Sequence, residues 1–325
     1  MNQIKKIKIH NKLLLFISLV LFFLAGYYIF DEISKKNHEF IKLNISINSI
    51  GFYLCLLLLI ILQFFNWFLE AVKFKILYLP YESISLKKAI YSVYIGNFTS
   101  FFTPDRMGSF IGRFLYLKNS SKLMITAVTA LGNLAQLIIT ILFMLIGSAL
   151  YILIDNQLVE FSNEIIISIF IAYFILFISL VIIYLNPSIV LQFMTRWKTI
   201  KTYILRLQSL DKLSAKTKTY VLLLSMLRYM IFYLQFYIVS IGFDLNISAV
   251  ELLVFIGLLY GIITFIPSPF MGNLGTREAL SIYLASGVIG LYAPLISFII
   301  WLVNVALSTL IGGALYSVLI KKEAT

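Results

Sequence analysis

The chain has 325 residues, of which 61% are hydrophobic and only 12% are charged, with a formal net charge of +12. Together with a mean hydropathy of +0.97, this composition excludes a water-soluble globular domain and indicates a polytopic helical membrane protein. The positive charge could indicate a nucleic-acid partner, but basic cytoplasmic loops give the same sum, and we expect no nucleic acid to bind.

Cysteine and histidine give no sign of a cross-link or a metal centre. Cys55 is the single cysteine, and the two histidines, His10 and His38, lie far apart outside the apolar runs. An intrachain disulfide is therefore excluded. We expect neither a metal nor another cofactor.

The chain begins with a basic segment and two apolar spans. Residues 1–12 contain four lysines and no acidic residue, and residues 13–30 are apolar. Because no small-x-small cleavage site follows, we interpret residues 13–30 as a transmembrane helix with its N-terminus in the cytoplasm, not as a signal peptide. The second span covers residues 50–69. The aromatic and basic residues of 66–75 then indicate a membrane–water interface.

A short apolar arm over residues 89–103 leads into the charged stretch 96–113. Fifteen residues at about 1.5 Å each reach roughly 22 Å, which is less than the hydrocarbon core of about 30 Å. Lysines flank the arm and its return to residue 117, which predicts a re-entrant hairpin that enters from the cytoplasm. Such backbone is tolerated only where protein buries it or where it lines an aqueous cavity. A long helix over residues 123–153 follows.

The second half repeats this order of elements. Two spans, a short pair of arms and a last span are predicted at residues 165–185, 220–241, 252–290 and 291–320. Residues 154–164 carry acidic but no basic side chains, whereas residues 186–218 carry seven basic residues and one acidic residue. The first loop is therefore predicted outside and the second in the cytoplasm, where part of it is expected to lie as an amphipathic helix on anionic lipid.

These elements predict a fold of the all-α polytopic membrane class. We expect a single membrane domain over residues 1–325, in the cytoplasmic membrane of the cell envelope, with both termini in the cytoplasm. Residues 1–153 and 165–322 would form two inverted repeats, each with three transmembrane helices and a re-entrant helical hairpin. Such repeats are common in transporters, with the substrate site near the midplane. The alternative is that residues 250–290 make two full crossings.

Ionisable residues at membrane depth are costly and usually functional. If residues 107–117 are helical, Arg106 and Arg113 lie on one face, and the helix N-terminus near Pro104 attracts anions. Arginine also suits bidentate phosphate binding. Alternatively, Asp105 could simply pair with Arg106. The predicted substrate-binding residues of this stretch are Asn97, Asp105, Arg106, Ser109 and Arg113, and its hairpin-shaping residues are Pro104, Gly108 and Gly112.

A second stretch, residues 266–278, is expected to face the first and to complete one site. Arg277 and Glu278 begin its outgoing helix, either as site residues or as a structural pair. The candidate binding residues here are Asn273, Arg277 and Glu278, with Arg228 from the preceding span. The candidate shaping residues are Pro267, Pro269, Gly272 and Gly275.

The motifs of both stretches resemble a known family. Thr-Pro-Asp-Arg-Met-Gly at residues 103–108, Gly-Arg at 112–113 and Pro-Ser-Pro…Gly…Gly-Thr-Arg-Glu at 267–278 are similar to the flippase-like membrane domain of lysylphosphatidylglycerol synthases. The resemblance covers nearly the whole chain. The family's first motif is usually Pro-x-Arg-x-Gly-Glu, and here Ser109 occupies the position of the glutamate. This departure removes a carboxylate, which Asp105 could replace, and it argues against a proton-coupled role or a cationic headgroup.

The resemblance implies a stand-alone member of the family. Because no soluble segment follows residue 325, we expect the chain to lack the synthetase half and not to make aminoacylated lipid. The leading hypothesis is a translocase, not an enzyme, for a phosphate-bearing lipid, either a phospholipid or a polyprenyl-phosphate-linked molecule. Two alternatives remain open: a membrane enzyme acting on lipid phosphate, and a non-catalytic membrane partner of a glycosyltransferase.

Overall fold

The computed structural model describes residues 20, 23–31, 34–35, 50–117, 121–153, 162–196, 207, 210, 213–268, 271–285 and 289–324. All regular elements in these ranges are helices. Five of them are long and apolar enough to span a membrane: Ile50–Tyr78, Lys122–Leu153, Glu164–Leu185, Ala215–Gly242 and Tyr292–Ile320. The chain is therefore a polytopic helical membrane protein, as predicted. Half of the predicted first span at residues 13–30 lies outside the described residues, and the described part, residues 20 and 23–30, is helical.

From residue 50 onward, the described part of the first half contains two long helices and a short helical hairpin between them. Its elements are α3 (Ile50–Tyr78), α4 (Leu86–Phe101), the 3₁₀ turn η1 (Pro104–Arg106), α5 (Ser109–Tyr116) and α6 (Lys122–Leu153). The predicted arms at 89–103 and up to 117 thus correspond to α4 and α5, which pack against each other.

The second half has a similar order of elements. These are α7 (Asn163–Leu185), α8 (Pro187–Met194), α10 (Ala215–Gly242), α11 (Ala249–Ile263), α12 (Thr276–Leu284), α13 (Ile289–Trp301), the π-helical segment η3 (Leu302–Ala306) and α14 (Leu307–Ala324). The predicted loop 186–218 ends earlier than expected, because α10 begins at Ala215. Lys218 is buried there, and its Nζ donates to the carbonyl of Leu185 at 2.7 Å.

Serine residues begin four of these helices. Ser85, Ser162, Ser214 and Ser248 each lie in extended backbone, and each side-chain oxygen accepts from the backbone N–H three residues later. This satisfies a donor that the helix itself leaves unpaired. At Ser248 the carboxylate of Glu251 bonds back to the serine N–H and completes a capping box. The short arm α11 therefore starts at a defined residue.

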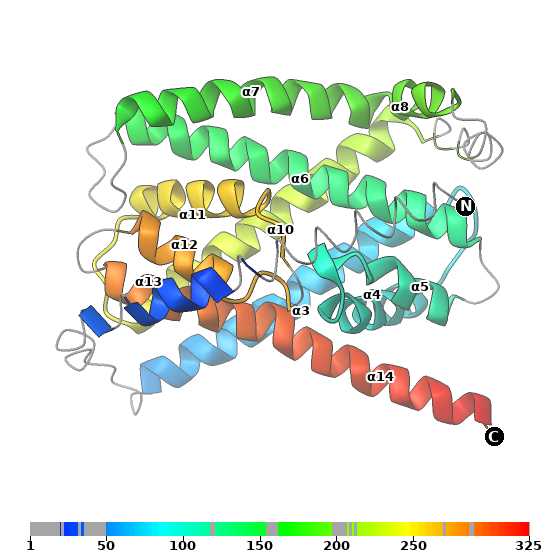
Figure 1. Ribbon diagram of the computed structural model, residues 1–325. Coiled ribbons are helices and arrows are strands. Elements are labelled where there is room, and N and C mark those ends of the chain that lie inside the picture. The colour runs from blue at the N-terminus through cyan, green and yellow to red at the C-terminus, as the bar shows by residue number, and fades with distance from the viewer. Residues whose placement is uncertain are drawn as a thin grey trace.

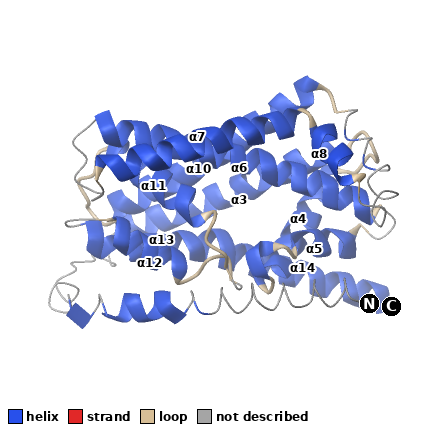
Figure 2. Cartoon of the chain, turned by 45° about the horizontal axis from the view of Figure 1, so that its top comes forward, coloured by secondary structure: helices blue, strands red, loops and turns tan. Residues whose placement is uncertain are grey.

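The two short hairpins lie at opposite ends of the molecule. Figures 1 and 2 show α4 and α5 at one end and α11 and α12 at the other, while α6 and α7 run along the length of the bundle. α4 packs against α14, α11 packs against α6, and α3 packs against α10. The loops that end α4 and α11 consequently lie in the middle of the bundle.

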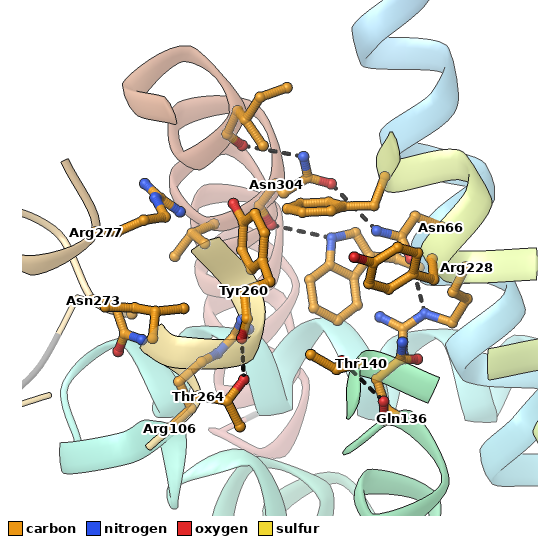
Figure 3. A pocket seen from close by; sticks show the side chains of 17 residues that line it. Asn66, Arg106, Gln136, Thr140, Arg228, Tyr260, Thr264, Asn273, Arg277 and Asn304 are labelled. Carbon is orange, nitrogen blue, oxygen red and sulfur yellow. Dashed lines mark hydrogen bonds between the residues drawn. The ribbon is translucent and has the colours of Figure 1, made fainter. Parts of the chain in front are cut away.

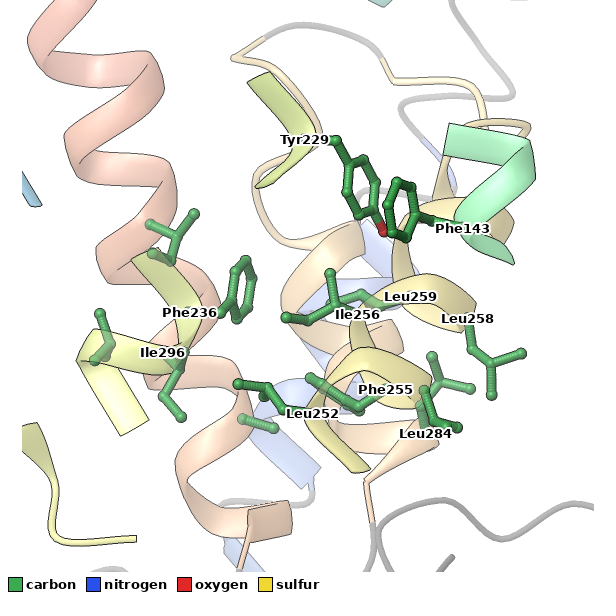
Figure 4. Close-up of a cluster of buried hydrophobic side chains, with 14 of the residues drawn as sticks. Phe143, Tyr229, Phe236, Leu252, Phe255, Ile256, Leu258, Leu259, Leu284 and Ile296 are labelled. Atoms are coloured by element: carbon green, nitrogen blue, oxygen red, sulfur yellow. The ribbon is translucent and has the colours of Figure 1, made fainter. Parts of the chain in front are cut away.

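Apolar packing holds each hairpin in place. One cluster joins α6, α10, α11 and α13, and Figure 4 shows Phe255, Ile256 and Leu259 of α11 within it. Phe143 of α6 stacks on Tyr229 of α10 in the same cluster, with ring centroids 4.0 Å apart. A second cluster joins α3 and α4 to the first half of α6. Close-packed interiors of this kind fix the positions of the loops that they carry.

Gly112 allows α5 to lie directly on α4. A Cβ atom at this position would lie 2.3 Å from the carbonyl oxygen of Ile95. We expect Gly112→Ala to lower the free energy of unfolding by about 1–3 kcal/mol, as overpacking does in other cores. Thermal unfolding in detergent measures this loss. Gly132→Ala is the matched control, because its added Cβ would lie 3.4 Å from Leu77. Equal stability of both variants would contradict the packing argument.

A cationic cavity between the two hairpin loops

The loops of the two hairpins contact each other directly, as predicted. The N–H of Asp105 donates to the carbonyl of Ser268 at 3.1 Å, and the N–H of Ser268 donates to Oδ1 of Asp105 at 2.7 Å. The N–H of Met271 donates to the carbonyl of Phe101 at 2.9 Å. Residues more than 160 positions apart are thereby joined. Pro267 lies in the second loop, whereas Pro269 lies outside the described residues.

A cavity of about 260 Å³ lies beside this junction (Figure 3). Its lining includes Arg106 from the first loop, Gly272, Asn273 and Arg277 from the second loop and α12, and Arg228 from α10. A neighbouring cavity of about 330 Å³ shares Arg106 and Arg228 with it. The predicted residues that line the second cavity are Asn97, Asp105, Arg106, Ser109, Arg113 and Arg228. Most of the predicted binding residues therefore meet around two adjoining cavities.

Glu70 of α3 is the centre of charge in this region, and sequence reasoning missed it. Its carboxylate accepts from Arg113 Nη2 at 3.1 Å and from Lys73 Nζ at 2.8 Å, and it also pairs with Arg228 Nη1. Glu70 and Lys73 are 5% and 1% exposed, so the group is withdrawn from solvent. Three cations thus share one carboxylate, which leaves an excess of positive charge.

The segment 66–75, predicted to mark a membrane–water interface, lies within one longer helix and is largely buried in the protein. α3 continues unbroken from Ile50 to Tyr78, and Asn66, Trp67, Glu70 and Lys73 are all buried in the protein. Hydrogen-bond and ion-pair partners on other helices compensate for the desolvation of these groups. The polar residues that looked like a boundary are therefore interior residues.

Arg228 connects the charges to a chain of amides. Its Nε donates to Oδ1 of Asn66 at 2.8 Å, and Asn66 Nδ2 donates to Oδ1 of Asn304 at 3.3 Å. Asn304 Nδ2 in turn donates to Oε1 of Gln235 at 2.8 Å. Asn304 lies in η3, and π-helical segments of this kind are often found at functional sites. The network joins α3, α10 and η3 behind the cavity.

Arg106 has no carboxylate partner among the described residues. Its guanidinium lies 5.6 Å from the centre of the Trp67 ring, and Arg228 lies 5.3 Å from the same ring. The alternative that Asp105 pairs with Arg106 is wrong, because Asp105 accepts from the backbone of Ser268 instead. A cation held on an aromatic face and lining both cavities remains available to an anion.

Arg106 and Arg113 do not share a helix face, contrary to prediction. α5 begins at Ser109, and Arg106 precedes it with φ 58° after Asp105 with φ 48°. Thr103 does not cap the turn that follows it; its Oγ1 accepts from the N–H of Gly108 at 2.7 Å. The left-handed backbone turns Arg106 out of the helical register.

Arg113 is more deeply buried than Arg106. It is 4% exposed, and besides Glu70 it binds Oγ1 of Thr129 at 2.9 Å through Nη1. Its guanidinium also lies 4.4 Å from the centre of the Phe74 ring. The prediction that Arg113 binds substrate stays a prediction, but much of its hydrogen-bonding capacity is already used inside the protein.

Arg277 and Glu278 form a closed pair at the start of α12. Arg277 Nη2 donates to Oε1 of Glu278 at 2.6 Å, and Arg277 Nε donates to Ser297 at 2.8 Å. The other oxygen of Glu278 accepts from the N–H of Gly275 at 2.6 Å, where φ is 83°. The geometry fits the structural alternative for this pair, with Arg277 also lining the cavity.

The buried polar residues that sequence reasoning missed differ in how visible they are in the sequence. Glu70 and Lys73 are three residues apart in a long apolar helix, a spacing that places them on one face. The amide groups of the network lie singly in apolar helices, where an uncharged polar side chain gives a weaker signal. These amides belong to Asn66, Gln136, Gln235 and Asn304.

The arrangement suits an anion better than a cation. Within the described ranges no group of His, Cys, Asp or Glu side chains could hold a metal ion. Positive charges outnumber carboxylates around the cavities, and guanidinium groups on low-dielectric walls attract phosphate strongly. Both cavities are lined by helices that are long and apolar enough to span a membrane.

The comparisons with known proteins agree with this description. No curated protein and no solved structure matches the chain significantly. A family model described as the lysylphosphatidylglycerol synthase TM region matches residues 13–312, which is nearly the whole chain. The chain therefore belongs to the family of lysylphosphatidylglycerol synthase transmembrane regions.

Proposed function

We propose that the protein moves a phosphate-bearing lipid between the leaflets of the cytoplasmic membrane. The observation that carries this proposal is the cation excess around the two cavities. Arg106, Arg113 and Arg228 line them with Glu70, whose charge is already shared with Lys73. Such an excess is costly at membrane depth unless it binds an anion during function.

Lipid phosphate is the anion that best reaches such a site. Arg106 and Arg228 approach the same Trp67 ring, and the Nη2 of Arg228 makes no hydrogen bond to a described residue. A phosphate held between the two guanidinium groups would receive charge-assisted hydrogen bonds and relieve their mutual repulsion. The acyl or prenyl chains would stay in the surrounding lipid.

Reciprocal contacts support the inverted-repeat part of the proposal. The first hairpin arm α4 packs on α14, the last helix of the second half, and α11 packs on α6, the last helix of the first half. Close glycine contacts occur at both places: Gly312 against Tyr94, and Gly257 against Phe143. Two repeats related by a two-fold axis produce paired contacts of this kind. Two re-entrant hairpins would then meet from opposite faces.

Purified protein in liposomes tests the proposed function. We expect a head-labelled phosphatidylglycerol to change leaflet at a rate that depends on the protein, and mass spectrometry should recover it unaltered. Chemically altered lipid would instead indicate a membrane enzyme. If the lipid is neither moved nor altered, the proposal is contradicted and a non-catalytic partner of another enzyme is favoured.

Cysteine labelling tests the proposed orientation. In a Cys55→Ser background, single cysteines in residues 154–164 should react with an impermeant thiol reagent from outside, and cysteines in residues 186–213 should react from the cytoplasm. The physical reason is the concentration of basic residues in the second segment. Labelling of residues 154–164 from the cytoplasmic side alone would overturn this orientation.

A further inference from the structure

The carboxylates of the cavity region already have hydrogen-bond or ion-pair partners in the protein, which limits the lipid headgroups that the site could bind. Both oxygens of Glu70 pair with cations, and both oxygens of Glu278 accept hydrogen bonds from Arg277 and Gly275. Asp105 is exposed at the edge and accepts from the backbone of Ser268. An ammonium group entering beside the phosphate would therefore meet arginines without a buried, unpaired carboxylate to balance it.

Uncharged polar side chains beside the arginines are less occupied. Asn97 is 5% exposed, lines the cavity, and its Nδ2 has no hydrogen-bond partner. The side chains of Ser109 and Asn273 also line the cavities and make no hydrogen bond to described residues. A buried amide donor without a partner is costly, which points to a ligand that accepts from it.

We propose that the substrate headgroup combines an anionic phosphate with uncharged hydroxyl groups, as in a phosphoglycerol or a phosphosugar. This inference rests on the proposed function and specifies the substrate of the same site. Arg106 and Arg228 hold the phosphate, while Asn97, Ser109 and Asn273 exchange hydrogen bonds with the hydroxyls. Zwitterionic and cationic headgroups are excluded by repulsion from the arginines.

Native mass spectrometry on the purified full chain tests this inference. The probes share the same acyl chains: phosphatidylglycerol, phosphatidic acid, phosphatidylethanolamine and lysylphosphatidylglycerol, with a polyprenyl-phosphate-linked hexose as a further probe. We expect phosphatidylglycerol or the hexose lipid to bind at least about tenfold more tightly than either amine-bearing lipid. The stronger of the two identifies the source of the hydroxyls, and phosphatidic acid should bind with intermediate affinity.

Ser109 provides a matched pair of variants. Ser109→Glu adds a carboxylate beside Arg113 and should reduce the preference for phosphatidylglycerol over the amine-bearing lipids about tenfold. Ser109→Gln introduces a neutral side chain of the same shape as glutamate and should retain this preference. Equal binding of phosphatidylethanolamine and phosphatidylglycerol by the unmutated protein would overturn the inference but leave the proposed function standing. Binding of none of the lipids would overturn both. The unmutated protein decides the matter even where a variant fails to fold.

Discussion

Replacing Glu70 with glutamine should greatly reduce the yield of folded protein. The substitution leaves Lys73, Arg113 and Arg228 buried together without their shared carboxylate. Breaking a buried ion pair by removing one partner typically costs about 3–5 kcal/mol, which is a large part of the stability of an ordinary domain. Yield of monodisperse protein and the midpoint of thermal unfolding in detergent measure the loss.

Two further variants separate charge balance from a general effect of the mutation. Glu164→Gln also removes a carboxylate, but at an exposed position in the first turn of α7, so its stability should be close to that of the unmutated protein. Adding Lys73→Met to Glu70→Gln removes one of the stranded cations and should restore part of the yield. A Glu70→Gln protein that melts with the unmutated protein would show that this ion-pair cluster does not hold the fold together.

The sequence alone was sufficient to predict the hairpin region because its signals are local. A charged stretch between short apolar arms, with proline and glycine at the break, indicated where the chain would turn back, and the structure places α4 and α5 there. That the two stretches face each other was also predicted from their similar pattern, and the structure shows this contact at Asp105 and Ser268. Helix length and charge periodicity carry this kind of information without any knowledge of partners.

The partners of the arginines could not be predicted in the same way. Glu70 lies 43 positions from Arg113 and 158 from Arg228, and no local pattern links them. Polar residues at the end of an apolar run are also common at membrane–water interfaces, so the end of the predicted span was placed where the apolar run ends, at residue 69. In the structure, α3 continues beyond that point to Tyr78. Burial of a charge depends on which helices pack around it, which is a property of the tertiary structure.

The prediction that Arg106 and Arg113 share a helix face was wrong because of the backbone conformation around Arg106. A separation of seven positions between Arg106 and Arg113 predicts one face only when the helix is continuous. Two consecutive residues with positive φ, Asp105 and Arg106, interrupt it. Positive φ at residues other than glycine is uncommon and sequence patterns rarely reveal it. The same break separates the roles of the two arginines, since it places Arg106 on Trp67 and leaves Arg113 paired with Glu70.

Replacing Arg106 with alanine should abolish most lipid movement while the protein still folds. Arg106 forms no ion pair with a described carboxylate, so its removal strands no partner. The loss of a charge-assisted hydrogen bond to phosphate, about 1.5–3 kcal/mol, corresponds to a roughly 10- to 150-fold slower rate at limiting lipid. Arg106→Lys keeps the charge but loses the planar guanidinium, so its rate of lipid movement should lie between those of the unmutated and Arg106→Ala proteins.

Controls distinguish this effect from a general loss of positive charge. Arg196→Ala removes an exposed arginine whose guanidinium lies 5.3 Å from the Phe193 ring, and lipid movement should be unchanged. Arg113→Ala should instead lower yield and stability, because it leaves part of the Glu70 cluster unpaired. Arg113→Ala thus differs from Arg106→Ala in the loss of a carboxylate partner, whereas Arg196→Ala differs from it because Arg196 lines neither cavity.

The most direct measurement is the rate at which head-labelled phosphatidylglycerol changes leaflet in liposomes that contain equal amounts of folded unmutated, Arg106→Ala or Arg196→Ala protein. The cation excess of the cavities predicts rapid movement with the unmutated and Arg196→Ala proteins and at least about tenfold slower movement with Arg106→Ala. If the Arg106→Ala protein moves the lipid at the unmutated rate, the cationic cavity between the hairpin loops is not the site of lipid binding.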